Sequence, residues 1–120
     1  MEDSTIKYIF DYYSHFMSLK EAAALKHYIT SYKFHKSLAN DKSGEKEIYL
    51  LDKNWLTRDS ETIGLLKDGF NNFQKRTAER ILAEHSNEIF FNNCPQCGKL
   101  ARTPFAQQCR FCRHDWHDSK

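Results

Sequence analysis

The sequence predicts an α+β protein, in which a helical N-terminal domain at residues 1–88 precedes a small module at residues 89–120. Apolar side chains recur at spacings of three and four over most of the first 88 positions, which is the period of helices with one buried face. A short apolar run, Ile89–Phe91, predicts a strand that leads into the last segment. All four cysteines lie in that segment, as two Cys-x-x-Cys pairs.

About three helices are expected in the N-terminal domain. The first covers roughly residues 4–17, and the second follows almost without a loop, over about residues 19–37. Ser18 and Glu21 have the spacing of a capping box, in which each side chain accepts a hydrogen bond from the other residue's backbone amide. This pattern predicts that the second helix begins at Leu19.

The third expected helix is the longest and covers about residues 60–85. We interpret its two glycines, Gly64 and Gly69, as permitting close helix contact rather than breaking the helix, although each weakens it by up to ~1 kcal/mol relative to alanine. A polar loop is expected at residues 39–46. The short apolar run at residues 48–51 fits a strand and a buried helical turn equally well.

Length and composition restrict the class of protein. A chain of 120 residues forms one domain, or a small domain with an appendage, and its 40% hydrophobic and 14% aromatic content is enough for a core. The formal net charge is only +2, and four thiolates with one Zn²⁺ would bring it close to neutral. A protein-wide basic field for nucleic acid is therefore not expected.

The start of the chain favours a cytoplasmic protein. The residues Met1-Glu2-Asp3-Ser4 are acidic or polar, whereas a secretion signal begins with basic residues and continues with an unbroken apolar run. No apolar stretch approaches the length of a membrane span, so no membrane association is expected. Cytoplasmic thiols stay reduced, which favours metal ligation over disulfide bonds.

The cysteine spacing predicts a metal site. Eleven residues separate the two pairs, and two such turns can complete the tetrahedral coordination that structural Zn²⁺ prefers. Gly98, directly after the first pair, can adopt the positive φ that such a turn needs. Arg113 occupies the matching position of the second pair, so there either a non-glycine residue is strained or the turn relaxes. The predicted ligands are Cys94, Cys97, Cys109 and Cys112.

The Cys-Pro-x-Cys-Gly-Lys turn and the second Cys-x-x-Cys resemble the zinc-ribbon superfamily over residues 89–118. That resemblance implies a small β fold, with hairpin strands at Leu100–Arg102 and Phe105–Gln108 and a third strand at His114–His117. Zinc ribbons serve in nucleic-acid binding, protein docking and stabilisation alike. The first 88 residues resemble no functional family, so the whole is similar to a small bacterial-type zinc-ribbon protein.

Other metal chemistry fits the cysteines less well. Rubredoxin-like iron sites also use four cysteines, but that family separates its pairs much further. A thioredoxin-type redox centre needs only one pair, at the start of a helix. His114 or His117 remains an alternative ligand that would replace one cysteine.

We therefore expect one structural Zn²⁺ per chain and no enzymatic activity, because four cysteines leave no coordination position for an activated water and no catalytic constellation stands out.

The first functional hypothesis is an adaptor that docks an unidentified protein partner. The alternative is a module that binds RNA or DNA, with basic residues contacting phosphates and aromatic rings stacking on bases. A plainer interpretation is that the cations offset the thiolate charge and the aromatic rings form the core. The candidate binding residues are Arg102, Phe105, Arg110, Phe111, Arg113 and Trp116.

Overall fold

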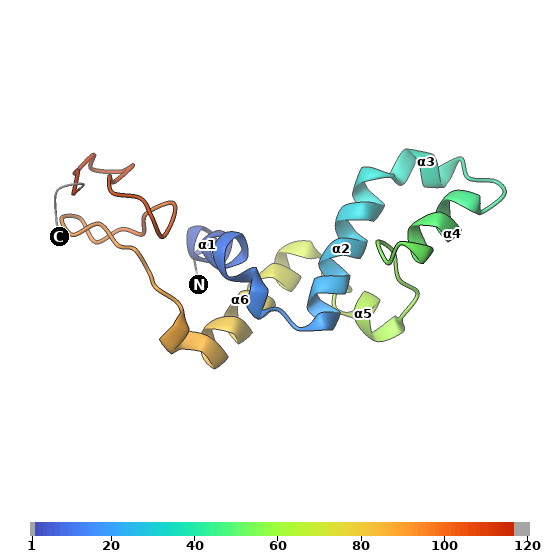
Figure 1. Ribbon diagram of the computed structural model, residues 1–120, viewed down its shortest axis with the longest axis horizontal. Coiled ribbons are helices and arrows are strands. Elements are labelled where there is room, and N and C mark those ends of the chain that lie inside the picture. The colour runs from blue at the N-terminus through green and yellow to red at the C-terminus, as the bar shows by residue number, and fades with distance from the viewer. Residues whose placement is uncertain (1, 117–120) are drawn as a thin grey trace. The chain divides into compact units, whose positions relative to one another are not determined.

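The computed structural model describes residues 2–116, and within them the chain is mainly helical (Figure 1). The prediction of an α+β fold with a β ribbon is wrong, because the only strand-like pairings in this range are two isolated bridges and no sheet forms. Six α-helices are found among residues 2–116, where three were predicted. They are α1 (Asp3–Tyr13), α2 (Leu19–Lys33), α3 (His35–Ala39), α4 (Glu45–Asp52), α5 (Ser60–Gly64) and α6 (Phe70–His85), with 3₁₀ turns at Ser14–Phe16 and Ser86–Glu88.

The described residues group into two compact units. The terminal unit consists of residues 2–16 together with 78–116, and the middle unit consists of residues 17–77. The sequence-based division into modules at residues 88 and 89 stays a prediction. None of the helices in residues 2–116 has both the length and the apolar character that crossing a bilayer requires.

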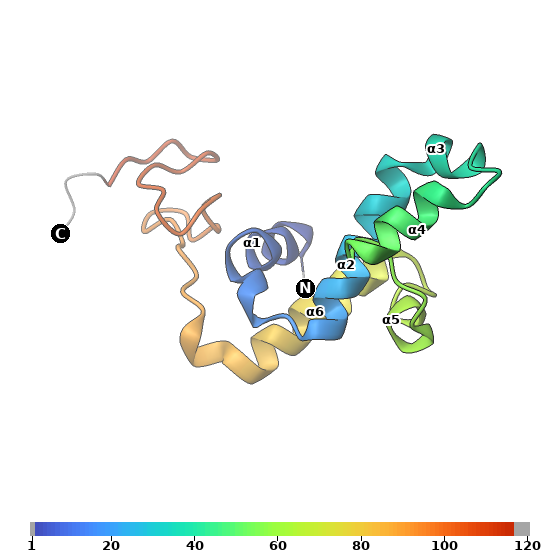
Figure 2. The same ribbon diagram turned by 45° about the vertical axis from the view of Figure 1, so that its right-hand side comes forward.

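The middle unit begins with the predicted capping box. The Glu21 amide donates to Ser18 Oγ at 3.1 Å, and the Ser18 amide donates to Glu21 Oε1 at 2.8 Å. The helix expected at residues 19–37 is interrupted at Phe34, whose φ of −107° is not helical. The chain reverses at α3, so that α4 runs in the opposite direction to α2 (Figure 2).

Residues 48–51, whose conformation the sequence left open, are helical and belong to α4. Leu50 is completely buried, and its carbonyl accepts hydrogen bonds from the amides of Trp55 and Leu56. The following amide, of Thr57, donates to Nδ1 of His27 on α2 at 3.1 Å. These bonds hold the connection after α4 against α2.

The single helix predicted at residues 60–85 is also wrong. A turn at residues 65–68 separates α5 from α6, and Gly69 then adopts a φ of +95°, which a helix cannot accommodate. A Cβ at Gly69 would meet nothing within 4 Å, so this glycine serves the backbone conformation and does not permit close packing. The turn at Gly69 thus overrides the apolar periodicity that suggested one helix.

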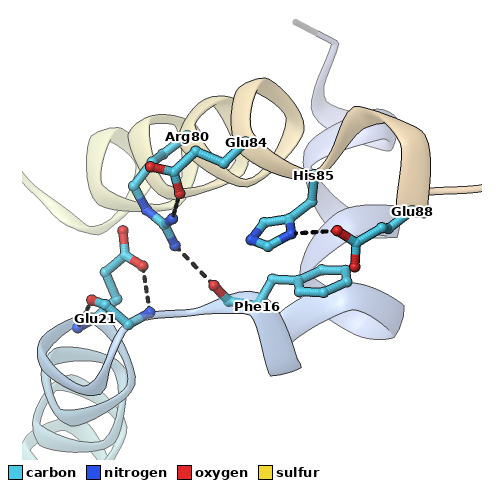
Figure 3. Close-up of polar contacts among 7 residues, drawn as sticks. Phe16, Glu21, Arg80, Glu84, His85 and Glu88 are labelled. Carbon is cyan, nitrogen blue, oxygen red and sulfur yellow. Dashed lines mark hydrogen bonds and ion pairs between the residues drawn. The ribbon is translucent and has the colours of Figure 1, made fainter.

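In the terminal unit, α1 buries Ile6, Tyr8 and Ile9, and the last two turns of α6 bury Ala78 and Ile81. Polar contacts join the 3₁₀ turn after α1 to the end of α6 (Figure 3). Figure 3 shows the Arg80 guanidinium donating to the Phe16 carbonyl, at 3.0 Å, and His85 Nδ1 lying 3.1 Å from Glu88 Oε1. The rings of Phe16 and His85 are stacked with centroids 4.0 Å apart.

Candidate metal centre

The four predicted ligands come together at one point of the terminal unit. All four Sγ atoms lie within 4.8 Å of one another. Two contacts join sulfurs of different turns, Cys94 to Cys112 at 3.6 Å and Cys97 to Cys109 at 3.5 Å. A tetrahedral Zn²⁺ with Zn–S bonds of about 2.3 Å requires S···S distances of about 3.8 Å. The sulfurs therefore lie close enough together to surround one metal ion.

The two cysteine turns have the same local structure. Backbone amides donate to the first sulfur of each turn at 3.3–3.4 Å, from Gln96 and Cys97 in one case and from Phe111 and Cys112 in the other. Amide hydrogen bonds stabilise thiolate charge and orient the ligands of a metal. In each turn the first cysteine is buried and the second is exposed.

Each turn is closed by its own flanking residues, and this explains why the implied ribbon does not form. The isolated bridges join positions on either side of one turn, Asn93 to Leu100 and Gln108 to Asp115. No bridge within residues 2–116 pairs Leu100–Arg102 with Phe105–Gln108, and of the expected third strand His117 lies outside the described residues. The closing bonds are Cys94 N to Lys99 O, Ala101 N to Asn92 O, Cys109 N to His114 O and Trp116 N to Gln107 O, at 2.7–2.9 Å.

Asn92 accounts for the loop between the two turns. Its buried side-chain amide donates to the carbonyls of Thr103 and Ala106, at 2.9 and 2.8 Å. The carbonyl groups that a hairpin would use for pairing are therefore bonded to a side chain. The loop at Thr103–Ala106 is a compact turn around Asn92 rather than the tip of a hairpin.

The cysteine thiols differ in acidity in the metal-free site. The hydrogen bond from the Cys112 amide lowers the pKa of the Cys109 thiol most. Burial raises this pKa and the Phe111 amide lowers it further, and the resulting pKa is about 6. Burial raises the pKa of Cys94, but hydrogen bonds from the Cys97 and Gln96 amides outweigh it and the pKa is lowered. For Cys112 the His114 backbone acts to lower the pKa, but burial and the neighbouring thiols raise it to about 12. A metal bound by all four sulfurs would displace the remaining protons.

Helix α1 anchors the segment that leads into the centre, which the sequence did not reveal. The Tyr8 hydroxyl donates to the Phe90 carbonyl at 2.6 Å and accepts from the Asn92 amide at 3.3 Å. The Tyr13 hydroxyl accepts from the Phe90 amide at 3.0 Å, and the ring of Tyr8 stacks on Phe91 with centroids 5.8 Å apart. The predicted strand at Ile89–Phe91 is therefore an extended segment bonded to tyrosine side chains. The dense group of tyrosines in α1 was the only available signal.

The candidate binding residues fall into separate groups. Arg102, Arg110 and Arg113 line one cavity of about 540 Å³ beside the second cysteine turn. Phe105 is 83% exposed and Phe111 is 51% exposed, so neither belongs to the core. Both Lys99 Nζ and the Arg110 guanidinium lie against the Phe111 ring.

Among the described residues, Trp116 and His114 do not line the cavity or belong to the thiol cluster. Trp116 is half-buried and stacks on His114, with ring centroids 6.0 Å apart. Within the described residues the ligand cluster comprises the four cysteines and does not include His114. The other alternative ligand, His117, lies outside that range.

Comparison with known proteins finds no family model, no curated protein and no solved structure that matches this chain. Of the predicted zinc-ribbon resemblance, the structure supports the clustering of four cysteines within metal-binding distance.

Proposed function

We propose that the chain is a non-catalytic zinc protein, in which one structural Zn²⁺ holds the terminal unit together as a binding module. The observation that carries this proposal is the cluster of four sulfurs at tetrahedral spacing. Thiolate sulfur is a ligand that Zn²⁺ prefers, and four cysteines fill its usual tetrahedral shell. The set of donors thus supports a structural role and leaves no position for a metal-bound water.

A bound metal also explains how the last segment folds. Residues 89–116 contain no helix or sheet, and their buried apolar side chains are few: Ile89 and Ala101, besides Cys94 and Cys109. So small a core does not offset the conformational entropy lost on ordering the chain. A structural zinc site supplies about 10 kcal/mol or more of binding free energy, which becomes folding free energy.

We propose docking of a protein partner as the role of this module. Its support is that Phe90, Phe105 and Phe111 are all more than half exposed, although aromatic rings are normally buried. Replacing Phe105 with a photo-crosslinking phenylalanine should capture one defined protein from cell extract only while zinc is bound, whereas the same replacement at half-buried Phe34 of the middle unit should capture none. Equal capture at both positions would contradict this role.

Nucleic-acid binding is a second candidate function, and the cavity lined by three arginines favours it. Affinity for nucleic acid falls steeply with salt because bound phosphates release counterions. Binding of an oligonucleotide that is unchanged between low and physiological salt would exclude this candidate. Protein docking through aromatic rings should respond little to salt.

A further inference from the structure

The arginines of this chain divide into two sets with different surroundings. Each of the three arginines outside the metal segment pairs with a carboxylate: Arg58 with Glu47, Arg76 with Asp68 and Arg80 with Glu84. Arg102, Arg110 and Arg113 form no ion pair with any described residue, and they line the same cavity of about 540 Å³. None of the described residues that line this cavity carries a carboxylate. Three arginine side chains thus line one cavity, and the acidic group beside them there is the thiol of Cys109.

The backbone at Arg113 is a second, independent observation. Arg113 has a φ of +64°, in the left-handed region that non-glycine residues rarely adopt, whereas Gly98 fills the matching position of the first turn. A glycine would be the unstrained choice here, as the first turn demonstrates. Strained backbone conformations are concentrated at functional sites, where the side chain is needed. The side chain in question is one that lines the arginine cavity.

The size and surroundings of the cavity indicate the class of ligand. Guanidinium groups match the geometry of phosphate oxygens and can bind them in a bidentate manner. Arg102 and Arg110 also line a second cavity of about 280 Å³, together with Lys7 and Asp11 of α1, which form an ion pair with each other. Phe105 lies in sequence between two residues of the first cavity, Thr103 and Ala106, and most of its ring is open to solvent.

We propose that Arg102, Arg110 and Arg113 bind successive phosphates of a single-stranded nucleic acid, with Phe105 as a stacking surface for a base. This inference rests on the second candidate function above and assigns that function to a site. Base stacking on exposed aromatic rings beside a basic groove is the general mode of single-strand binding, and it does not depend on the base sequence. A duplex hides its base faces, so it offers Phe105 nothing to stack on.

The rival explanation is that the arginines only offset the formal charge of a tetrathiolate zinc centre. Cys109 does line the cavity, so the two charges are neighbours. However, the hydrogen bonds that described residues direct at the sulfurs come from backbone amides and other thiols. The arginine side chains therefore remain available for an external anion.

The test uses the zinc-loaded full chain, a labelled single-stranded oligothymidylate and fluorescence anisotropy over a range of salt concentrations. Arg113→Gly keeps the backbone conformation that the turn needs and removes one phosphate contact. It should weaken binding about tenfold and reduce the slope of log affinity against log salt by about 0.7, while the protein stays folded. Arg102→Ala should act similarly. Lys75→Ala, which removes one charge from an exposed position on α6, should change the affinity less than about twofold.

The outcomes separate this inference from the function on which it rests. Wild-type binding that Arg113→Gly and Arg102→Ala weaken no more than Lys75→Ala would overturn the site and leave nucleic-acid binding standing. Failure of the wild-type, zinc-loaded protein to bind the oligonucleotide would overturn both. Binding of inorganic phosphate by a protein that does not bind the strand would assign the cavity to a small phosphate ligand and overturn the proposal. Loss of zinc affinity without loss of strand binding would support the charge-offset explanation.

Discussion

Gly98 and Arg113 occupy matching positions of the two cysteine turns, and both adopt positive φ, +76° and +64° respectively. Each directly follows the second ligand of its turn, Cys97 or Cys112. The turn geometry, which brings two sulfurs of each turn toward one point, dictates the backbone conformation in both cases, and only Gly98 satisfies it without strain. The second turn therefore keeps its shape in spite of its sequence.

This relationship predicts opposite effects of substitution at the two positions. Gly98→Ala should lower the free energy of unfolding of the zinc-loaded protein by about 1 kcal/mol or more, although a Cβ would meet nothing within 4 Å, because the left-handed conformation disfavours a side chain. Arg113→Gly should raise it by up to ~1 kcal/mol. Denaturant unfolding followed by circular dichroism measures both. As a control, Gly64→Ala in α5, at an ordinary φ and with equal space, should not destabilise. A stabilising Gly98→Ala would contradict the predicted strain.

The hydroxyl of Tyr8 predicts the strength of the link between α1 and the metal segment. Tyr8→Phe removes the bonds to the Phe90 carbonyl, which keeps the Tyr13 hydroxyl at 3.3 Å, and to the amide of buried Asn92, which loses this partner. We expect a loss of about 1–3 kcal/mol in the free energy of unfolding. Tyr12→Phe, at a half-buried position on the same helix, should cost less than about 0.5 kcal/mol. Equal effects of the two substitutions in urea unfolding would show that the hydroxyl bonds are unimportant.

The imidazole of His27 predicts a pH dependence. Burial lowers the pKa of His27, and its Nδ1 accepts a hydrogen bond from the Thr57 amide, which only an unprotonated nitrogen can do. The unfolded chain therefore binds this proton at higher pH than the folded chain. The contribution is fully present above the unfolded pKa of about 6.5 and is lost as pH falls through it towards the lower folded value.

The measurement is the unfolding midpoint between neutral and mildly acidic pH for the wild type and for His27→Gln, whose side-chain oxygen can accept the same hydrogen bond without titrating. The unfolding midpoint should change less with pH in His27→Gln than in the wild type. His35→Gln, at an exposed position, is the matched control and should keep the wild-type slope. A His27→Gln slope equal to that of the wild type would contradict the role of His27.

The ligands predict the effect of losing one sulfur. Cys109→Ser should reduce zinc affinity by several orders of magnitude, because a hydroxyl oxygen replaces a thiolate that two backbone amides already stabilise. Competition with a colorimetric zinc chelator measures the change. As a control, Phe111→Ser, between the two ligands of the same turn, should leave the zinc affinity within about threefold of the wild type. A Cys109→Ser protein that competes as well as the wild type would remove Cys109 from the site.

The sequence predicted the parts of this structure that depend on short-range chemistry. The capping box at Ser18 and the positive φ of Gly98 each follow from residues a few positions apart. The two cysteine pairs meet over 12 and 18 positions, and there the ligand chemistry of the repeated Cys-x-x-Cys pattern supplied the prediction. The prediction of one long helix at residues 60–85 is wrong because the apolar periodicity continues across Gly69, where the positive φ ends the helical conformation. The ribbon that the resemblance implied does not form, because the Asn92 side chain donates to the carbonyls of the loop between the turns. These bonds join residues 11 and 14 positions apart, and no sequence pattern indicates them.

The candidate site, too, could be predicted only in part from the sequence. Three of the binding residues singled out in the sequence meet at one cavity, but Trp116 packs on His114 instead. Tyr8 was not singled out, because its partners lie more than 80 positions away and the bond to Phe90 joins a side chain to a backbone atom. The plainer interpretation placed the aromatic rings of the metal segment in its core, whereas Phe105 and Phe111, also named as candidate binding residues, are exposed.

Native mass spectrometry of freshly purified, untagged protein, repeated after denaturation, tests the zinc centre most directly. We predict a mass excess equal to one zinc ion per chain, less the mass of the thiol protons that the ion displaces, and loss of that excess on denaturation. The same experiment on a protein with all four cysteines replaced by serine should show no bound metal. A folded wild-type protein that carries no metal, or that carries iron in place of zinc, would contradict the proposed centre.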